Sequence, residues 1–282
     1  MKIVIIGAHG YIGSRVLSEA RKVTTILGTT SQETDSSVRL RLDLADQFNY
    51  ECIQKTDVIL LTAAISAPDI CSREHERAWA VNVTGTSLFI SKVIDKGARV
   101  IFFSSDTVYG ERADEFDENA PPNPVGDYAV MKYAVESRFL GDTAFKTIRL
   151  SYIFSIEDKF TKYLCGCAER GEEAEIFHPF FRPVVHREDV VQGVIALALR
   201  WDEFPQSVIN FGGPDVISRT EFAQRLTDCA FPSLLFRKIE PEPSFFANRP
   251  RVIQMRSPLL ASLLGRPARS LRDAIQHEFN LK

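Results

Sequence analysis

Residues 2–20 read KIVIIGAHGYIGSRVLSEA and contain the pattern that decides the fold. The apolar run Lys2–Ile6 has the length of a buried β-strand, and apolar residues then repeat every four positions from Ile12 to Ala20, as on one face of a helix. The turn between them, Gly7–Gly13, has the spacing G-x-x-G-x-x-G. Such a turn could simply join a strand to a helix, but glycines here also let backbone N–H groups approach a pyrophosphate at the helix N-terminus. We therefore predict a dinucleotide-binding turn.

Strand-like and helical patterns alternate through the first 150 residues. Near-continuous apolar runs, typical of strands buried on both faces, lie at Val23–Leu27, Val58–Leu61, Val100–Phe103 and Thr147–Leu150. Val38–Leu42 alternates apolar and charged residues, which predicts a strand at a sheet edge. Tyr128–Leu140 is helical by composition and periodicity. This alternation predicts an α/β fold with a Rossmann-like, doubly wound parallel sheet.

The composition changes after about Leu150. Ser155–Pro183 is aromatic and mixed in charge, whereas Val184–Leu199 returns to a strand-turn-helix pattern and Val208–Phe211 to a strand. The tail contains many prolines, which predicts short helices joined by turns. We therefore expect a smaller C-terminal lobe that is interwoven with the first. The acidic stretch 114–118 is expected to be a solvated loop.

The composition excludes several classes of protein. Thirty-four Lys and Arg against 37 Asp and Glu leave a net charge of −3, with no basic excess to bind a nucleic acid. No apolar run is long enough to span a membrane. The five cysteines are scattered, and Cys165-Gly-Cys167 is too closely spaced for a zinc site, so no metal is expected. A reduced, cytoplasmic compartment is predicted.

The end of the second predicted strand bears on the choice of cofactor. Dinucleotide-binding folds often place an acid there for the ribose 2′-hydroxyl, but Gly28–Ser31 contains none. Small hydroxyls such as Thr29 could instead bind a 2′-phosphate, so NADP(H) is favoured and NAD(H) remains an alternative. Glu33 or Asp35 could still fold back onto the ribose. Asp43 could accept a hydrogen bond from adenine or cap the following helix.

Tyr128 and Lys132 are four residues apart and lie on one face of the predicted helix. An ammonium beside a phenol lowers the pKa of the phenol, which makes Tyr128 a candidate general acid or base. The strand at Val100–Phe103 ends in Ser104-Ser105-Asp106-Thr107, at the sheet edge where ligands bind. Hydroxyls that only stabilise a turn would give the same pattern.

The chain resembles the extended short-chain dehydrogenase/reductases, the NAD-dependent epimerase/dehydratase superfamily, in the branch that modifies nucleotide-activated sugars. The shared motifs are the glycine turn, Leu42-Asp43-Leu44, Thr62-Ala63-Ala64, Val81-Asn82-Val83-Thr84-Gly85-Thr86, Ser104-Ser105-x-x-Val108-Tyr109-Gly110, Tyr128 with Lys132, and Ile148-Arg149-Leu150. The compact length and Asn248-Arg249-Pro250 most resemble the dTDP-4-dehydrorhamnose reductase-like branch.

The resemblance implies three sets of site residues. The catalytic set is Ser105, Tyr128 and Lys132. The cofactor set is Gly7, Gly10, Tyr11, Ile12, Gly13, Thr29, Asp43, Leu44, Thr62, Ala63, Ala64, Asn82, Tyr128 and Lys132. The substrate set is Ser105, Asp106, Thr107, Arg182 and Arg249, with the two arginines as diphosphate ligands or as ordinary surface residues. The family topology also implies a dinucleotide-binding domain of residues 1–150 plus about 184–213, and a substrate-binding lobe of about 151–183 and 214–282.

Departures from the family narrow the expected reaction. The sugar 4,6-dehydratases have an Asp-Glu pair after the catalytic hydroxyl, whereas here Thr107 follows Asp106, and the cysteine of the epimerase-reductases is absent. We therefore expect an NAD(P)-dependent oxidoreductase that reduces a keto group of a nucleotide sugar. The alternatives are a nucleotide-sugar 4-epimerase with bound NAD and a non-catalytic cofactor-binding subunit. The sequence leaves open the sugar, the nucleotide and whether the protein is a homodimer.

Overall fold

The computed structural model describes residues 1–32, 38–112 and 114–281. Its largest sheet has seven strands in the order β10-β6-β5-β4-β1-β2-β3. These are β1 (Ile3–Ile6), β2 (Ile26–Thr30), β3 (Val38–Arg39), β4 (Val58–Leu61), β5 (Arg99–Ser105), β6 (Phe145–Leu150) and β10 (Val208–Phe211). The pairs from β3 through to β5 are parallel. The predicted Rossmann-like sheet is confirmed.

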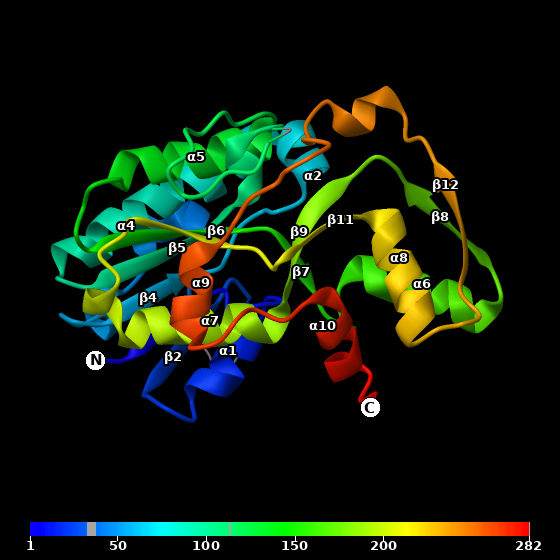
Figure 1. The fold of residues 1–282 in the computed structure, drawn as a ribbon. Coiled ribbons are helices and arrows are strands. Elements are labelled where there is room, and N and C mark those ends of the chain that lie inside the picture. The colour runs from blue at the N-terminus through cyan, green and yellow to red at the C-terminus, as the bar shows by residue number, and fades with distance from the viewer. Residues whose placement is uncertain (33–37, 113, 282) are drawn as a thin grey trace. The chain divides into compact units, whose positions relative to one another are not determined.

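Helices cover both faces of this sheet. The helices of the first half of the chain are α1 (Gly13–Ala20), α2 (Pro68–Arg73), α3 (His75–Trp79), α4 (Thr86–Asp95) and α5 (Asp127–Phe139). Figure 1 shows α4 and α5 on one face and α1 on the other. Alternate strand residues such as Val4 and Ile59 join Phe89 of α4 and Val135 of α5 in one apolar cluster. The strands are therefore buried on both faces, as their apolar runs predicted.

Smaller sheets and the remaining helices occupy the second half. The strands are β7 (Tyr152–Phe154), β8 (Glu173–Phe177), β9 (Phe181–His186), β11 (Asp215–Ser218) and β12 (Leu235–Ile239). They form a three-stranded sheet, β11-β9-β7, and a two-stranded sheet, β12-β8. The helices are α6 (Lys159–Arg170), α7 (Arg187–Leu199), α8 (Arg219–Cys229), α9 (Pro258–Leu264) and α10 (Leu271–Glu278). A separate apolar core joins α6, α8 and α10 to these strands.

The chain forms two compact units. The first comprises residues 1–108, 124–149 and 194–209, and the second comprises residues 109–123, 150–193 and 210–282. The chain therefore passes repeatedly from one unit to the other. Their division into a dinucleotide-binding domain and a substrate-binding lobe stays a prediction. Among the residues described, no helix is long and apolar enough to cross a membrane.

Several element bounds differ from the predicted ones. The second strand was predicted from Val23, but β2 begins at Ile26, because Val23 and Thr24 donate backbone hydrogen bonds to Ala20 O at the end of α1. The third strand stops at Arg39, and a 3₁₀ helix begins at Leu42. The acidic stretch 114–118 is not wholly a solvated loop: Phe116 is buried, forms a β-bridge with Met255 and stacks on Tyr109.

Candidate active site

The glycine turn after β1 is built so tightly that side chains would not fit. Gly7 has φ +92°, and its carbonyl accepts a hydrogen bond from Gly10 N at 3.0 Å. A Cβ on Gly13 would lie 2.2 Å from Gly7 O, and one on Gly7 would lie 3.0 Å from Ala63 Cβ. The turn therefore needs glycine for the close approach of its own backbone and of the segment after β4. This is the geometry of a cradle for phosphate groups.

The hydroxyl of Thr62, just after β4, stabilises this turn. It donates to Ile6 O at 2.8 Å and approaches Gly7 O at 3.3 Å. Tyr11 is exposed at the turn, whereas Ile12 is buried in the core. Thr62 and Ile12 therefore stabilise the turn; Thr62 is partly exposed, and Tyr11 is the most exposed of the three.

A cavity of about 430 Å³ opens beside the glycine turn. It is lined by Ile6, Gly7, Ser31, Arg39, Leu40, Arg41, Leu42, Asp43, Ala63, Ala64, Ile65, Arg77 and Val81. The structure therefore brings together four of the predicted cofactor residues, Gly7, Asp43, Ala63 and Ala64. Leu44 and Asn82, also predicted for the cofactor, are not part of this lining.

Thr29 does not reach the cavity. Its side chain is buried, and within the described part of the chain its hydroxyl has no hydrogen-bond partner. Thr30 is also occupied, because its hydroxyl accepts a hydrogen bond from Gln32 N at 3.2 Å. Ser31 is the residue of this segment that lines the cavity, because β2 ends at Thr30 and the chain leaves the sheet there. Glu33 and Asp35 lie outside the described residues.

Three arginines that the sequence reasoning missed line the same cavity. Arg39 of β3 pairs with Thr30 of β2, which brings it close to Ser31 despite their separation in sequence. Arg41 and Arg77 complete the set. The alternation of arginine and leucine in residues 38–42 was the available signal, because on an edge strand it places both arginines on one face. The cavity is thus more basic than the sequence reasoning expected.

Asp43 is paired with one of these arginines. Arg41 Nη2 lies 2.6 Å from Asp43 Oδ2. The hydrogen bond from Arg41 lowers the pKa of Asp43, and partial burial opposes it. The N-cap position of the following 3₁₀ helix is Arg41, and Asp43 lies in its first turn, so Asp43 is not the cap that one interpretation of the sequence suggested.

Asn82 holds the loop that follows β4. It lies in a π-helical segment, Ala80–Gly85, a distortion that is frequent at functional sites. Its amide accepts a hydrogen bond from Ile65 N and donates one to Ile65 O, both at 2.9 Å. Asn82 therefore positions the backbone beside Ala63 and Ala64, which line the cavity.

Helix α5 brings Tyr128, which is partly buried, close to Lys132, which is buried. Lys132 Nζ lies 5.7 Å from the centre of the Tyr128 ring and donates a hydrogen bond to Phe103 O at 2.7 Å. It also lies 4.7 Å from the centre of the Phe102 ring. The lysine thus links α5 to the carboxyl end of β5.

Ser105 ends β5, and the two residues after it bind its hydroxyl. Ser105 Oγ lies 3.2 Å from Asp106 Oδ1 and accepts hydrogen bonds from Thr107 N at 3.2 Å and Thr107 Oγ1 at 3.0 Å. Ser105 and Asp106 are both buried. The three predicted substrate residues of this segment therefore form one hydroxyl–carboxylate group, within electrostatic reach of Tyr128.

Burial is the main cause of the pKa shifts of Tyr128 and Lys132. Burial raises the pKa of Tyr128 well above its usual range, and nearby Cys71 and Asp106 raise it further. Burial lowers the pKa of Lys132 to about 8, while Glu136 and Cys71 oppose that shift. The expectation that Lys132 lowers the pKa of Tyr128 is therefore not met, because the ammonium is directed at Phe103 O and desolvation outweighs its field.

Replacing Lys132 by methionine should change how stability depends on pH. Between pH 8 and 10.5, the unfolded parent holds the Lys132 proton and the folded parent releases it, so the free energy of unfolding of the parent rises across this window. The variant lacks this contribution. We expect the parent to gain roughly 2 kcal/mol relative to Lys132→Met between about pH 8 and pH 10, by urea denaturation. A difference that does not vary with pH would contradict the shift.

The predicted substrate arginines lie in the second unit. Arg182 is buried and donates to the carbonyls of Phe181 and Pro250, both at 2.6 Å. Arg249 donates to Phe245 O at 3.1 Å. Both guanidinium groups therefore bind backbone carbonyls, and their role as substrate ligands stays a prediction.

A third arginine in this region was missed by the sequence reasoning. Arg219 begins α8 and lies over the rings of Phe160 and Phe180, at 4.8 and 4.7 Å from their centres. Burial and nearby Arg249 lower its pKa. Arg219 and Arg182 line one small pocket with Tyr152 and Phe160. Nothing local in the sequence marks Arg219, because this pocket forms from distant segments.

Known structures share this fold. The structure of MoeE5 in complex with UDP-glucose and NAD superposes with a TM-score of 0.83 at 21% identity, covering 99% of this chain and 98% of that one. Among curated proteins, methionine adenosyltransferase 2 subunit beta of Xenopus laevis is 23% identical over 88% of this chain and 78% of its own length.

The dTDP-4-dehydrorhamnose reductase of Mycobacterium tuberculosis is 29% identical over 49% of this chain and 45% of its own length. Matches to a curated dehydratase and a curated epimerase also span less than half of those proteins. The family model described as the RmlD substrate binding domain matches residues 1–281, almost the whole chain. The chain therefore belongs to the RmlD substrate binding domain family, within the extended short-chain dehydrogenase/reductases.

Proposed function

We propose that the protein is an NAD(P)-dependent reductase of a keto group on a nucleotide-activated sugar. The observation that carries this proposal is the pair of partly buried Tyr128 and buried Lys132, with the Ser105–Asp106–Thr107 group at the carboxyl end of β5 within electrostatic reach of Tyr128. Family membership supports it, because the family is one of nucleotide-sugar-modifying enzymes. The tight turn of Gly7, Gly10 and Gly13 at the start of α1 supports a dinucleotide, because glycine-rich turns of this kind bind a pyrophosphate at a helix N-terminus.

The proposed mechanism assigns one task to each residue. When bound, the nicotinamide cofactor supplies a hydride to the keto carbon. Tyr128 gives its phenolic proton to the oxygen as the hydride arrives, so that the carbonyl becomes an alcohol and solvent later restores the proton. The raised pKa of Tyr128 keeps the phenol protonated at neutral pH, which is the form that a proton donor needs.

Ser105 and Lys132 complete this arrangement. The Ser105 hydroxyl would turn its single proton from Asp106 to the keto oxygen and so orient it, while Thr107 N and Thr107 Oγ1 still donate to Ser105 Oγ. Lys132 supplies a positive charge beside the phenolate that forms, and it would hold the nicotinamide ribose. Because the pKa of Lys132 is about 8, this charge should be lost in the alkaline range. Activity should therefore decline above about pH 8.

The cofactor proposed is NADP(H), with Ser31 and Arg39 as ligands of the 2′-phosphate in place of Thr29. Ser31 and Arg39 both line the cavity beside the glycine turn. A guanidinium suits phosphate oxygens, and the register of β2 and β3 places Arg39 beside Thr30, next to Ser31 in the sequence. NAD(H) remains the alternative for a protein of this family.

Replacing Arg39 by alanine should weaken NADPH binding and leave NADH binding nearly unchanged. A charge-assisted hydrogen bond contributes about 1.5–3 kcal/mol, so we expect an affinity loss of roughly 10- to 100-fold for NADPH. Fluorescence titration of both cofactors would measure it. Arg73→Ala is a matched control, since its side chain is 70% exposed in the same unit and does not line the cavity. Equal losses for both cofactors would contradict the assignment.

The substrate screen that tests the function uses NADPH and NADH with a panel of nucleotide-activated keto-sugars. Cofactor oxidation together with an alcohol product identified by mass spectrometry would support the reductase. Interconversion of 4-epimers, with NAD carried through purification, would instead identify the 4-epimerase. A 4-keto-6-deoxy product from dTDP-glucose is not expected, because Thr107 stands where dehydratases have a second acid.

A non-catalytic role is the second candidate. It is favoured by the match to methionine adenosyltransferase 2 subunit beta, which extends over 88% of this chain. Normal cofactor binding without turnover of any sugar in the screen would support this role. The complete set of Ser105, Tyr128 and Lys132 favours the enzyme.

A further inference from the structure

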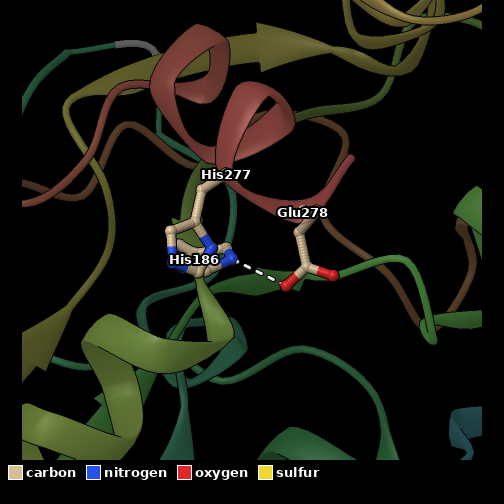
Figure 2. A group of neighbouring side chains, drawn as sticks. All are labelled: His186, His277 and Glu278. Carbon is tan, nitrogen blue, oxygen red and sulfur yellow. Dashed lines mark hydrogen bonds and ion pairs between the residues drawn. The ribbon is translucent and has the colours of Figure 1, made fainter. Parts of the chain in front are cut away.

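Two histidines and a glutamate form a cluster within the second unit, and none of them belongs to the proposed active site. His186 is the last residue of β9, and His277 and Glu278 are the last two residues of α10. His186 Nε2 lies 2.8 Å from Glu278 Oε1, and one donor atom from each of the three residues lies within 4.8 Å of the others. Figure 2 shows the two imidazole rings close together and the carboxylate of Glu278 beside His186.

We propose that His186, His277 and Glu278 form a binding site for a divalent transition-metal ion, with Zn²⁺ as the best fit. Two imidazole nitrogens and one carboxylate oxygen are the donor types that Zn²⁺ binds, at about 2.0–2.2 Å. With three protein ligands, a water molecule would take the fourth position. Nothing in the proposed reductase reaction uses these residues, so the metal site is independent of that function.

The burial of His186 is the second observation in favour of a ligand. Its side chain is fully buried, and Nδ1 has no hydrogen-bond partner among the residues that the structure describes. A buried imidazole with one unsatisfied nitrogen costs free energy. Coordination of a metal ion at Nδ1 would offset that cost, because Nδ1 is the nitrogen without a partner, whereas Nε2 already bonds Glu278 Oε1.

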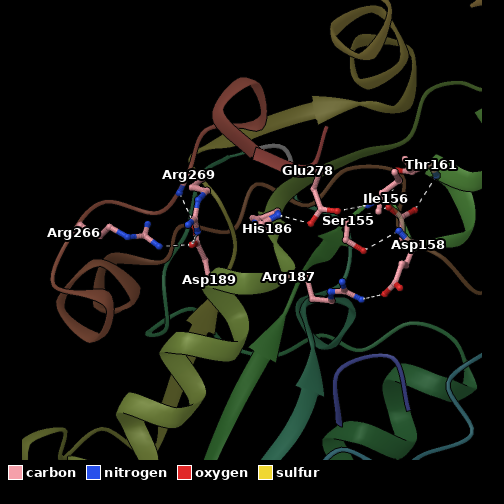
Figure 3. A network of polar contacts seen from close by, with 11 residues as sticks. Ser155, Ile156, Asp158, Thr161, His186, Arg187, Asp189, Arg266, Arg269 and Glu278 are labelled. Atoms are coloured by element: carbon pink, nitrogen blue, oxygen red, sulfur yellow. Dashed lines mark hydrogen bonds and ion pairs between the residues drawn. The ribbon is translucent and has the colours of Figure 1, made fainter. Parts of the chain in front are cut away.

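The charged side chains around the cluster pair with groups outside it, and within the cluster Glu278 Oε1 bonds His186 Nε2. Figure 3 shows that Asp189 is bound by Arg266 and Arg269. Arg187 pairs with Glu157. Glu278 Oε2 accepts a hydrogen bond from Ile156 N at 2.9 Å, which orients the carboxylate and leaves Oε1 toward His186. A backbone donor of this kind is typical of the second layer around a metal ligand.

The donor atoms must approach each other for binding. Tetrahedral coordination at the usual zinc distances separates donor atoms by about 3.4 Å, so the widest spacing of 4.8 Å has to contract. His277 is the exposed member of the cluster, and rotation of its side chain can supply this movement. The ion would then link the end of β9 to the C-terminal helix α10.

The test compares metal binding by the full chain and by a His277→Ala variant, after stripping with a chelator. We expect the parent to bind one equivalent of Zn²⁺ that His277→Ala lacks or binds at least tenfold more weakly, in competition with a chromophoric chelator. Zn²⁺ should also raise the Tm of the parent by several degrees more than that of the variant. Arg272→Ala, at an exposed position on the same helix, is the matched control.

Co²⁺ provides a second readout, because cysteines elsewhere in the chain could also bind Zn²⁺. Tetrahedral Co²⁺ bound by nitrogen and oxygen ligands gives a visible absorption without the intense thiolate band. We expect that absorption in the parent and its loss in both His277→Ala and Glu278→Gln. Equal stoichiometry and affinity in the parent and in His277→Ala, or a thiolate band only, would overturn the proposal.

Discussion

Replacing Tyr128 by phenylalanine is expected to lower the turnover of keto-sugar reduction by roughly 10²–10⁴-fold, the usual contribution of a positioned acid or base. The substitution removes one oxygen and keeps the ring in its partly buried place on α5. Cofactor affinity and thermal stability should therefore change little. Steady-state kinetics with the best substrate of the screen, together with cofactor titration, would measure the effect.

The matched control is Tyr133→Phe, at another tyrosine of the same helix. Position 133 is five residues from Tyr128, so it lies on a different part of the helix surface and should not affect proton transfer. Unchanged turnover in Tyr128→Phe would eliminate the proposed mechanism. A comparable loss in both variants would indicate that disturbance of α5, and not proton donation, is responsible.

Features set by neighbouring residues were predictable from the sequence. The glycine turn and the pair of Tyr128 and Lys132 depend on spacings within a single turn or helix. The strands Val58–Leu61 and Val208–Phe211 begin and end as predicted, because apolar runs bounded by polar residues or glycine define them locally. The geometry of the glycine turn is also determined by residues close in sequence, since only glycine tolerates the close backbone approach at Gly13.

Features that depend on pairing between distant segments were not predictable. Ser31 and Arg39 meet through the register of β2 and β3, so the basic character of the cavity could not be read from the end of β2 alone. The partners of Arg182 come from Phe181 and Pro250, which the fold brings together. The spacing of Tyr128 and Lys132 on one helix suggested a lowered pKa for Tyr128. Burial by distant segments raises that pKa instead.

A buried ion pair lies one turn beyond Lys132. Arg149 of β6 binds Glu136 of α5 through Nη2 at 2.6 Å and Nε at 3.2 Å, with both side chains almost wholly buried. Removing both charges from such a pair is often tolerated, whereas removing one leaves the other buried without its partner. Glu136 also acts on Lys132, since its charge opposes the lowering of the pKa of Lys132 by burial.

Replacing Glu136 by glutamine should therefore destabilise the protein by about 3–5 kcal/mol, measured by urea denaturation. The double variant Glu136→Leu with Arg149→Met should recover much of this loss, because no unpaired charge then remains in the interior. Asp202→Asn is the control: its pair with Arg99 is exposed, with the Asp202 side chain 80% accessible, and should contribute less than about 1 kcal/mol. Loss of the same size in both single variants would show that burial does not set the strength of the pair between Glu136 and Arg149.

Because Glu136→Gln also removes a carboxylate that stabilises the charged form of Lys132, the alkaline limit of activity should move to lower pH in this variant.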